Sequence, residues 1–161
     1  FDPVRYGFRV GAPNTANQIV WYGRGPIESY PDRKESCPVG LYRSTPMELV
    51  HFYDRPSESG ARSDVRFLAV TSEKGDGVLI QKENKSHFSF TATPYSPEDI
   101  DDNSHTETLP VEDGYELFLD FYQKEIERTG KSPKHPNSSN TQEATFVFEP
   151  ITGMNREEPG M

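Results

Sequence analysis

Four polar or aromatic side chains within six positions could bind a ligand. The stretch WYGRGPIESYPDR (residues 21–33) carries Glu28, Tyr30, Asp32 and Arg33 after two glycines and a proline. A carboxylate and a guanidinium can bind paired hydroxyls, and an aromatic ring can pack on the face of a sugar. This chemistry would suit a polyhydroxylated ligand. In the alternative interpretation the groups satisfy one another, with Asp32 or Glu28 paired with Arg33 and Tyr30 closing the core.

The same stretch has the composition of a rigid corner. Gly23 and Gly25 permit close backbone approach, while Pro26 and Pro31 fix φ. Trp21 lies in a strand that should anchor the loop to the core. We therefore expect the loop to organise neighbouring strands first, and to contact a sugar at most as a second use.

The arginines of this region are expected to be held inside the domain by carboxylates and backbone carbonyls. Arg33 and Arg66 each offer five donors in a planar fork. Asp32 and Glu58 are the acids expected to pair with them. Loss of one partner of a buried pair is costly, so Arg33→Ala is expected to lower the melting temperature strongly.

The elements that position these residues are predicted to be β-strands, because apolar residues recur with a period of two. Gly75 and Gly77 around Asp76 predict a hairpin turn. Several short strands separated by Gly, Asn, Asp and Pro turns predict an all-β antiparallel sandwich. Strands are expected over residues 6–12, 64–72, 77–81, 87–93, 115–121 and 144–150.

Two stretches compete as helix. SPEDI (96–100) has Ser96 as N-cap, Pro97 in the first turn and Asp99 as the capping acid, which predicts one short turn. FYQKEIERTG (121–130) is interpreted instead as the end of a strand followed by a loop.

The predicted organisation is one sandwich domain and a tail. Residues 1–150 are assigned to the sandwich, residues 131–142 within it to a mobile polar loop, and residues 151–161 to a flexible tail. Strand-like sequence begins almost at residue 1, which suggests a piece excised from a longer protein or a processed protein.

Composition excludes several classes of function. The 161 residues carry a net charge of −9 with no basic stripe, which argues against nucleic acid. No apolar run is long enough to span a membrane, and the single cysteine, Cys37, excludes an internal disulfide. No spacing of His, Cys or carboxylates suggests a metal site, and no nucleophile motif or phosphate loop occurs. Neighbouring acids such as Asp101 and Asp102 are typical of a solvated face.

Three ordered segments resemble the large β-galactosidases of glycoside hydrolase family 2. Residues 21–33 closely resemble the Gly-x-Gly-Pro-x-Glu-x-Tyr-Pro-Asp-Arg signature near the start of the last domain, also called the small chain. A second similar segment contributes Pro56, Glu58, Gly60, Arg62 and Arg66, and a third contributes Tyr95, His105 and Leu109. The resemblance covers residues 15–123.

The resemblance implies a fold and a role. The fold would be an antiparallel β-supersandwich similar to galactose mutarotase. The chain would be a non-catalytic C-terminal domain that shapes the mouth of an active site and packs against the catalytic barrel domain or a large subunit. The parent enzyme would hydrolyse terminal β-D-galactosides with retention, through two glutamates of a (β/α)₈ barrel. The family's substrate-contacting tryptophan has no counterpart here, since Trp21 belongs to the first signature.

The resemblance also implies partners and site residues. No cofactor is expected in this fragment, whereas the parent would use Mg and Na in its barrel domain. Partners would be that barrel and, through it, the galactoside, with no nucleic acid and no membrane. A bacterial source is expected, and the compartment, cytoplasmic or periplasmic, stays open. No catalytic or metal-binding residue is expected, and the candidates for substrate binding are Glu28, Tyr30, Arg33, Glu58, Arg62 and His105.

Two other functions stay open. A mutarotase-like epimerase would use His105 with Glu58 or Glu28 as acid and base on a sugar ring. A stand-alone carbohydrate-binding module would present a row of exposed aromatic side chains, for which the candidates are Phe52, Tyr53 and Tyr95.

Overall fold

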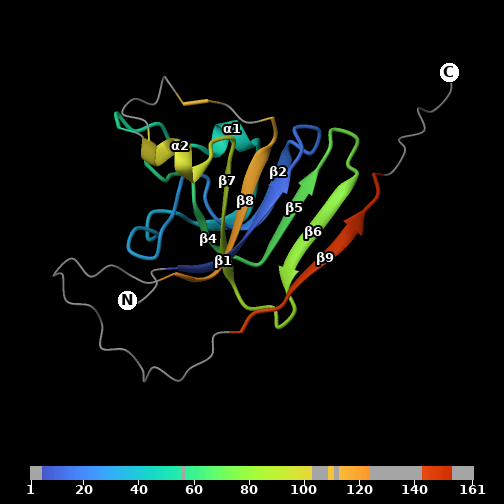
Figure 1. Cartoon of the computed structure of the whole chain (residues 1–161). Helices are drawn as coiled ribbons and strands as arrows, with labels where there is room; N and C mark the ends of the chain where they lie inside the picture. The colour runs from blue at the N-terminus through green and yellow to red at the C-terminus, as the bar shows by residue number, and fades with distance from the viewer. Residues whose placement is uncertain (1–4, 56, 103–108, 111–112, 124–142, 154–161) are drawn as a thin grey trace, which may run out of the picture.

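Two antiparallel β-sheets pack face to face in this protein (Figure 1). The computed structural model describes residues 5–55, 57–102, 109–110, 113–123 and 143–153. The four-stranded sheet has the order β1 (Arg5–Ala12), β8 (Tyr115–Gln123), β7 (Phe88–Thr93) and β4 (Arg62–Val65). The five-stranded sheet has the order β3 (Val39–Ser44), β2 (Gln18–Arg24), β5 (Phe67–Thr71), β6 (Gly77–Lys82) and β9 (Phe146–Ile151). The predicted all-β antiparallel sandwich is confirmed.

The core lies between the sheets and is built by alternation along the strands. Ile19 and Trp21 of β2 point inward beside Leu68 of β5, and all three are almost fully buried. The Trp21 ring meets the ring of Phe90 from the opposite sheet at 5.7 Å between centroids, edge to face. The indole N–H donates to the Arg24 carbonyl at 3.0 Å, so its polar atom is satisfied inside the core.

Most predicted strands are confirmed, with ends that differ by one or two residues. The hairpin between β5 and β6 is also confirmed, since Gly75 has a φ of +86° and Ser72 bonds to Asp76 across the turn at 2.8 Å. β9 continues to Ile151, and the Gly153 N–H donates to the Asp76 carboxylate at 2.8 Å. The expected mobile loop at 131–142 and residues 154–161 of the expected tail lie outside the described residues.

The single strand predicted over 64–72 is wrong, because the chain changes sheets within it. β4 belongs to the four-stranded sheet and β5 to the five-stranded sheet. Asp64 has a φ of +51°, and the Arg66 N–H donates to the Tyr22 carbonyl at 2.8 Å where the chain crosses over. Buried apolar residues lie on both sides of Arg66, Val65 in β4 and Leu68 in β5, so the apolar pattern continues across the crossing.

Two short helices occur in the described part of the chain. α2 (Pro97–Asp102) confirms the predicted turn: the Asp99 N–H bonds to Ser96 Oγ at 3.0 Å. α1 (Pro46–Leu49), which the sequence analysis missed, has Thr45 as its N-cap and a capping box closed by Glu48. Neither helix is long and apolar enough to cross a membrane, nor is any other helix among the described residues.

Candidate functional site

The loop after β2 is bonded to the segment that leads into β4. The Ser29 N–H donates to the Ala61 carbonyl at 2.8 Å, and the Ser63 N–H donates to Ser29 Oγ at 2.9 Å. The Glu28 carboxylate accepts from the Gly60 N–H at 3.0 Å. The first two sequence segments that carry the resemblance are therefore joined directly, and the corner interpretation of residues 23–33 is confirmed.

Glu28 is the central acid of this corner. Its carboxylate also accepts hydrogen bonds from the Tyr53 hydroxyl and from Arg33, with which it forms an ion pair. Burial alone would raise the pKa of Glu28, but the Gly60 N–H, the Tyr53 hydroxyl and the Arg33 charge together hold that pKa below its ordinary value. Glu28 is thus an anion fixed by the protein's own donors.

Tyr30 and Arg33 lie against each other at the edge of the corner. The Arg33 guanidinium stands 5.4 Å from the centre of the Tyr30 ring, and their backbones form an isolated β-bridge. Burial, followed by the nearby charges of Glu28 and Glu58, raises the pKa of Tyr30. The Arg33 side chain is 57% exposed.

Arg62 is buried under the corner, with a relative exposure of 4%. Its guanidinium donates to the carbonyls of Pro26 at 3.0 Å and Gly60 at 2.7 Å, and lies 5.5 Å from the centre of the Trp21 ring. Burial lowers the pKa of Arg62 to about 10, which still leaves it a cation at neutral pH. Its described contacts tie the loop, β4 and the core together.

The expected acid partners of the arginines are confirmed in part. Arg33 pairs with Glu28, the acid named as the alternative to Asp32, whereas the pairing of Glu58 with Arg66 is wrong, because Glu58 pairs with Arg5. The Arg66 guanidinium donates to the Asp64 carbonyl and stands 5.5 Å from the Tyr22 ring centre, so a backbone carbonyl does hold it as expected. His105 lies outside the described residues.

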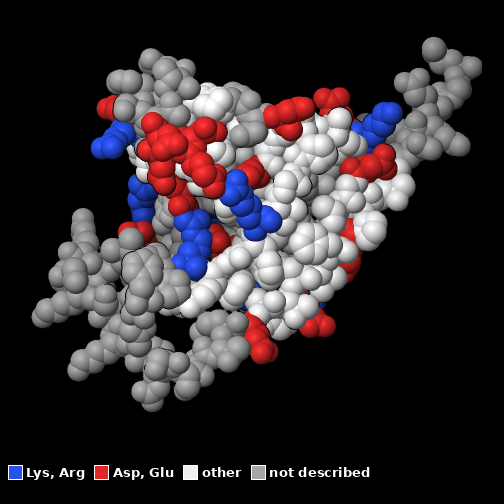
Figure 2. All heavy atoms as spheres, in the orientation of Figure 1, with Lys and Arg blue, Asp and Glu red and all other residues white. Residues whose placement is uncertain are grey.

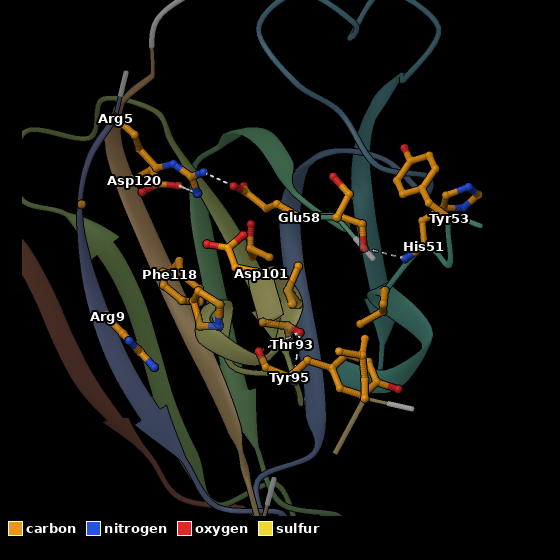
Figure 3. Close-up of a pocket in the computed structure, with 18 of the residues that line it drawn as sticks. Arg5, Arg9, His51, Tyr53, Glu58, Thr93, Tyr95, Asp101, Phe118 and Asp120 are labelled. Atoms are coloured by element: carbon orange, nitrogen blue, oxygen red, sulfur yellow. Dashed lines mark hydrogen bonds and ion pairs between the residues drawn. The ribbon is translucent and has the colours of Figure 1, made fainter. Parts of the chain in front are cut away.

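A pocket of about 520 Å³ opens on the outer face of the four-stranded sheet (Figure 3). We call it the outer pocket. Its floor is formed by outward-facing residues of β1, β7 and β8, and its rim by the segment after α1 and by α2. The residues that line it are Arg5, Gly7, Phe8, Arg9, Val50, His51, Phe52, Tyr53, Ser57, Glu58, Ser59, Thr91, Thr93, Tyr95, Pro97, Ile100, Asp101, Leu109, Phe118 and Asp120.

One end of the outer pocket is ionic. Arg5 from β1 pairs with Asp120 of β8 at 3.3 Å and with Glu58, and Figure 3 shows the three side chains meeting. Asp120 is only 5% exposed. Burial raises the pKa of Asp120 to about 6, and the Arg5 charge keeps it from rising further.

Aromatic rings form much of the remaining wall. Phe118 projects from β8, and Tyr95 follows β7. The rings of Phe52 and Tyr95 stand edge to face at 6.3 Å, and those of His51 and Tyr53 at 4.5 Å. The three aromatic residues that the sequence analysis named for a binding module, Phe52, Tyr53 and Tyr95, therefore line the same pocket.

A second arginine of the outer pocket, Arg9, is bonded to the acidic helix α2. Arg9 bonds to Glu98 of α2 at 3.2 Å and to Glu116 of β8 at 2.7 Å. Figure 2 shows acidic side chains gathered over α2, with basic side chains next to them. Among the residues that the structure describes, no group of three or more His, Cys, Asp or Glu is placed to hold a metal ion.

The sequence predicted the corner better than the pocket. Of the five candidate residues that the structure describes, Glu28, Tyr30, Arg33 and Arg62 gather in the corner, and Glu58 lines the outer pocket. Arg5, Thr91, Phe118 and Asp120 were missed. The sequence carried only a weak signal for the outer pocket. Alternation along β7 and β8 predicts which side chains face outward, but it does not predict which segments cover them.

Comparison with known proteins gives consistent matches. A model of the family described as "Beta galactosidase small chain" matches residues 2–148. A beta-galactosidase of Priestia megaterium is 30% identical over 141 residues, which cover 84% of this chain and 13% of that protein. A beta-galactosidase of Vibrio cholerae is 39% identical over 116 residues, covering 72% of this chain and 10% of that protein. The chain thus spans about a tenth of the length of these relatives.

Proposed function

This chain belongs to the beta-galactosidase small-chain family, and from that membership we propose that it is a non-catalytic domain of a larger enzyme that hydrolyses terminal β-D-galactosides. The observation that carries the proposal is the match over residues 2–148, combined with relatives named beta-galactosidase of which it spans 13% and 10%. The catalytic machinery of such an enzyme would then lie in the remaining part.

The chemistry of the described residues supports a non-catalytic role. A retaining glycosidase needs one carboxylate as nucleophile and another as acid and base, about 5–5.5 Å apart and both free to reach the sugar. Here Glu28 is held by a backbone N–H, a phenol and an arginine, while Glu58 and Asp120 share Arg5. We assign the two catalytic carboxylates, and the Mg and Na that the resemblance implies, to the barrel domain, whose residues are not in this chain.

An open edge of the sandwich supports packing against that larger part. Phe8 and Val10 of β1 stand opposite Leu119 and Leu117, on the core side of the sheet, yet they are 48% and 38% exposed. Phe148 of the edge strand β9 is also 48% exposed. Apolar core-side residues exposed along an edge mark a surface that another domain or subunit covers. We infer that this edge packs on the rest of the enzyme and that the domain helps to shape the mouth of its active site.

The test compares this chain with the assembled enzyme. The 161-residue chain by itself should give no turnover of a chromogenic β-galactoside above an empty-vector control. The larger remainder of the enzyme, expressed separately, should bind the chain in gel filtration and hydrolyse the substrate faster in its presence. Turnover of the substrate by this chain alone would contradict the proposal. So would a remainder of the enzyme that neither binds the chain nor hydrolyses the substrate faster in its presence.

A further inference from the structure

We propose that the outer pocket is a binding site for an uncharged sugar ring, either a monosaccharide or a disaccharide. The site uses this chain's own residues on β1, β7, β8 and the segment after α1. This goes beyond the proposed function, because it gives the domain a ligand of its own. Only the choice of galactose and lactose as first probes rests on the proposed function.

The charges of the pocket select a neutral ligand. Arg5 is already paired with Glu58 and Asp120, and Arg9 is bonded to Glu98 and Glu116. An anionic ligand would have to compete with two carboxylates for each guanidinium. A sugar hydroxyl can instead donate to a carboxylate oxygen or accept from a guanidinium N–H without breaking the ion pairs.

An unpartnered hydroxyl in the wall points to a hydrogen-bonding ligand. Thr91 of β7 is 2% exposed and lines the pocket, and its Oγ1 has no hydrogen-bond partner among the described residues. Thr93, two residues along on the same face, bonds to the backbone N–H of Tyr95 at 3.1 Å. Leaving a buried hydroxyl unpaired costs stability. Thr91 lines the pocket, and rotation about χ1 would turn its enclosed Oγ1 toward a ligand hydroxyl, which would supply the partner that the described residues do not provide.

The apolar wall and the size of the pocket suit a sugar ring. Phe118, Tyr95 and Phe52, which line the pocket, would offer aromatic surface to the C–H face of a pyranose. The ionic end formed by Arg5, Glu58 and Asp120 would face its hydroxyls (Figure 3). The volume of about 520 Å³ lies within the range of about 300–1,000 Å³ that is typical of small-molecule pockets. An uncharged sugar ring has an apolar C–H face and polar hydroxyls, and the pocket offers aromatic surface to the first and paired charges to the second.

The experiment measures sugar binding to the full 161-residue chain, with its fold checked by circular dichroism. Saturation-transfer NMR and calorimetry are run with galactose and lactose, for which we expect dissociation constants of about 1 mM. Galacturonate has the same ring with a carboxylate, and galactitol has similar hydroxyls without the ring. Both should bind at least about fivefold more weakly than galactose if a neutral ring is the ligand.

Thr91→Val separates a binding role from a structural one. Valine has nearly the same shape, and the lost hydroxyl had no partner, so the melting temperature should be unchanged or higher. Galactose binding should weaken about fivefold, the loss typical of one hydrogen bond. Ser72→Ala is the matched control, because it removes another buried hydroxyl without a described partner, in the β5–β6 turn outside the pocket. It should leave binding unchanged.

Each result decides the proposal. Weaker galactose binding in Thr91→Val at an unchanged melting temperature supports it. No binding of either neutral sugar by the folded chain overturns it. Equal or tighter binding of galacturonate or galactitol, or equal galactose binding by the two variants, also overturns it. None of these measurements uses galactoside hydrolysis, so a failure here leaves the proposed function intact, and the reverse holds as well.

Discussion

The Glu28 carboxylate accepts a hydrogen bond from the Gly60 N–H at 3.0 Å, across 32 residues of sequence. This contact joins the loop after β2 to the segment that enters β4. The Ser29 N–H continues the connection through the Ala61 carbonyl at 2.8 Å. A short polar sequence therefore fixes how one sheet is attached to the other.

Glu28→Ala should destabilise the protein by about 2–3 kcal/mol, because hydrogen bonds to a charged group contribute about 1.5–3 kcal/mol and several are lost together. Chemical denaturation measures the free energy of unfolding. Asp32→Ala is the control in the same loop, since no ion pair of Asp32 occurs among the described residues. Its effect should stay within about 0.5 kcal/mol. Equal effects of the two variants would mean that Glu28 does not organise the corner.

Gly60→Ala should destabilise the protein by more than about 2 kcal/mol. Gly60 has a φ of +82°, and a Cβ at this position would lie 2.5 Å from the Leu49 carbonyl oxygen. Both the strained backbone and the clash act against alanine. Gly11→Ala is the control, because a Cβ there would meet nothing within 4 Å. We expect the melting temperature to fall for Gly60→Ala and to stay unchanged for Gly11→Ala. Equal melting temperatures of the two variants would show that the backbone conformation of Gly60 does not require glycine.

Arg62 and Arg33 should differ sharply in their contribution to stability. Arg62→Ala removes a buried guanidinium from two carbonyls and from Trp21, and should cost about 3 kcal/mol. Arg33→Ala should cost no more than about 1 kcal/mol, since an exposed ion pair contributes little. We therefore predict the strong loss of stability for Arg62→Ala instead of Arg33→Ala. Thermal denaturation of both variants tests this ranking. A larger fall in melting temperature for Arg33→Ala than for Arg62→Ala would contradict it.

The sequence predicted the sandwich because its inward residues alternate, and it failed where burial breaks the pattern. Val65, Leu68 and Val70 are all buried although they belong to different sheets, so buried apolar residues continue on both sides of Arg66, where the chain crosses over. β3 was missed because its apolar residues Val39 and Leu41 lie on the exposed face, whereas Gly40, Tyr42 and Ser44 form the less exposed face. α1 carried a readable signal in Thr45, Pro46 and Glu48, which the period-two interpretation passed over.

The corner could be foreseen because its groups are close in sequence and chemically complementary. The pairing of Arg33 with Glu28 is such a local contact, five residues apart. The outer pocket could not be foreseen, because Arg5 and Asp120 are 115 residues apart in the sequence and meet only through the pairing of β1 with β8. Contacts between distant strands depend on register, which no single segment specifies.

The contribution of Asp120 to the free energy of unfolding should decline as the pH rises from about 4 to about 6. Burial raises the pKa of Asp120 from its ordinary value of 3.8 to about 6 in the folded protein, with the Arg5 charge opposing and Glu58 reinforcing the rise. Between these two values the folded state binds the proton and the unfolded state does not, so the free energy of unfolding falls with rising pH. A shift of about two pKa units corresponds to about 3 kcal/mol.

Asp120→Asn isolates this contribution, because the amide keeps the shape of the acid and cannot ionise. Other carboxylates, such as Glu28 with its lowered pKa, titrate in both proteins and cancel in the difference. The stability of the variant relative to the parent should therefore increase by up to about 3 kcal/mol between about pH 4 and pH 7. Denaturation across this range gives the difference, and the chemical shift of the Asp120 carboxyl carbon gives its pKa directly. Parallel stability curves, or an Asp120 that titrates near its ordinary value, would show that Arg5 and the solvent together keep this acid ionised despite its burial.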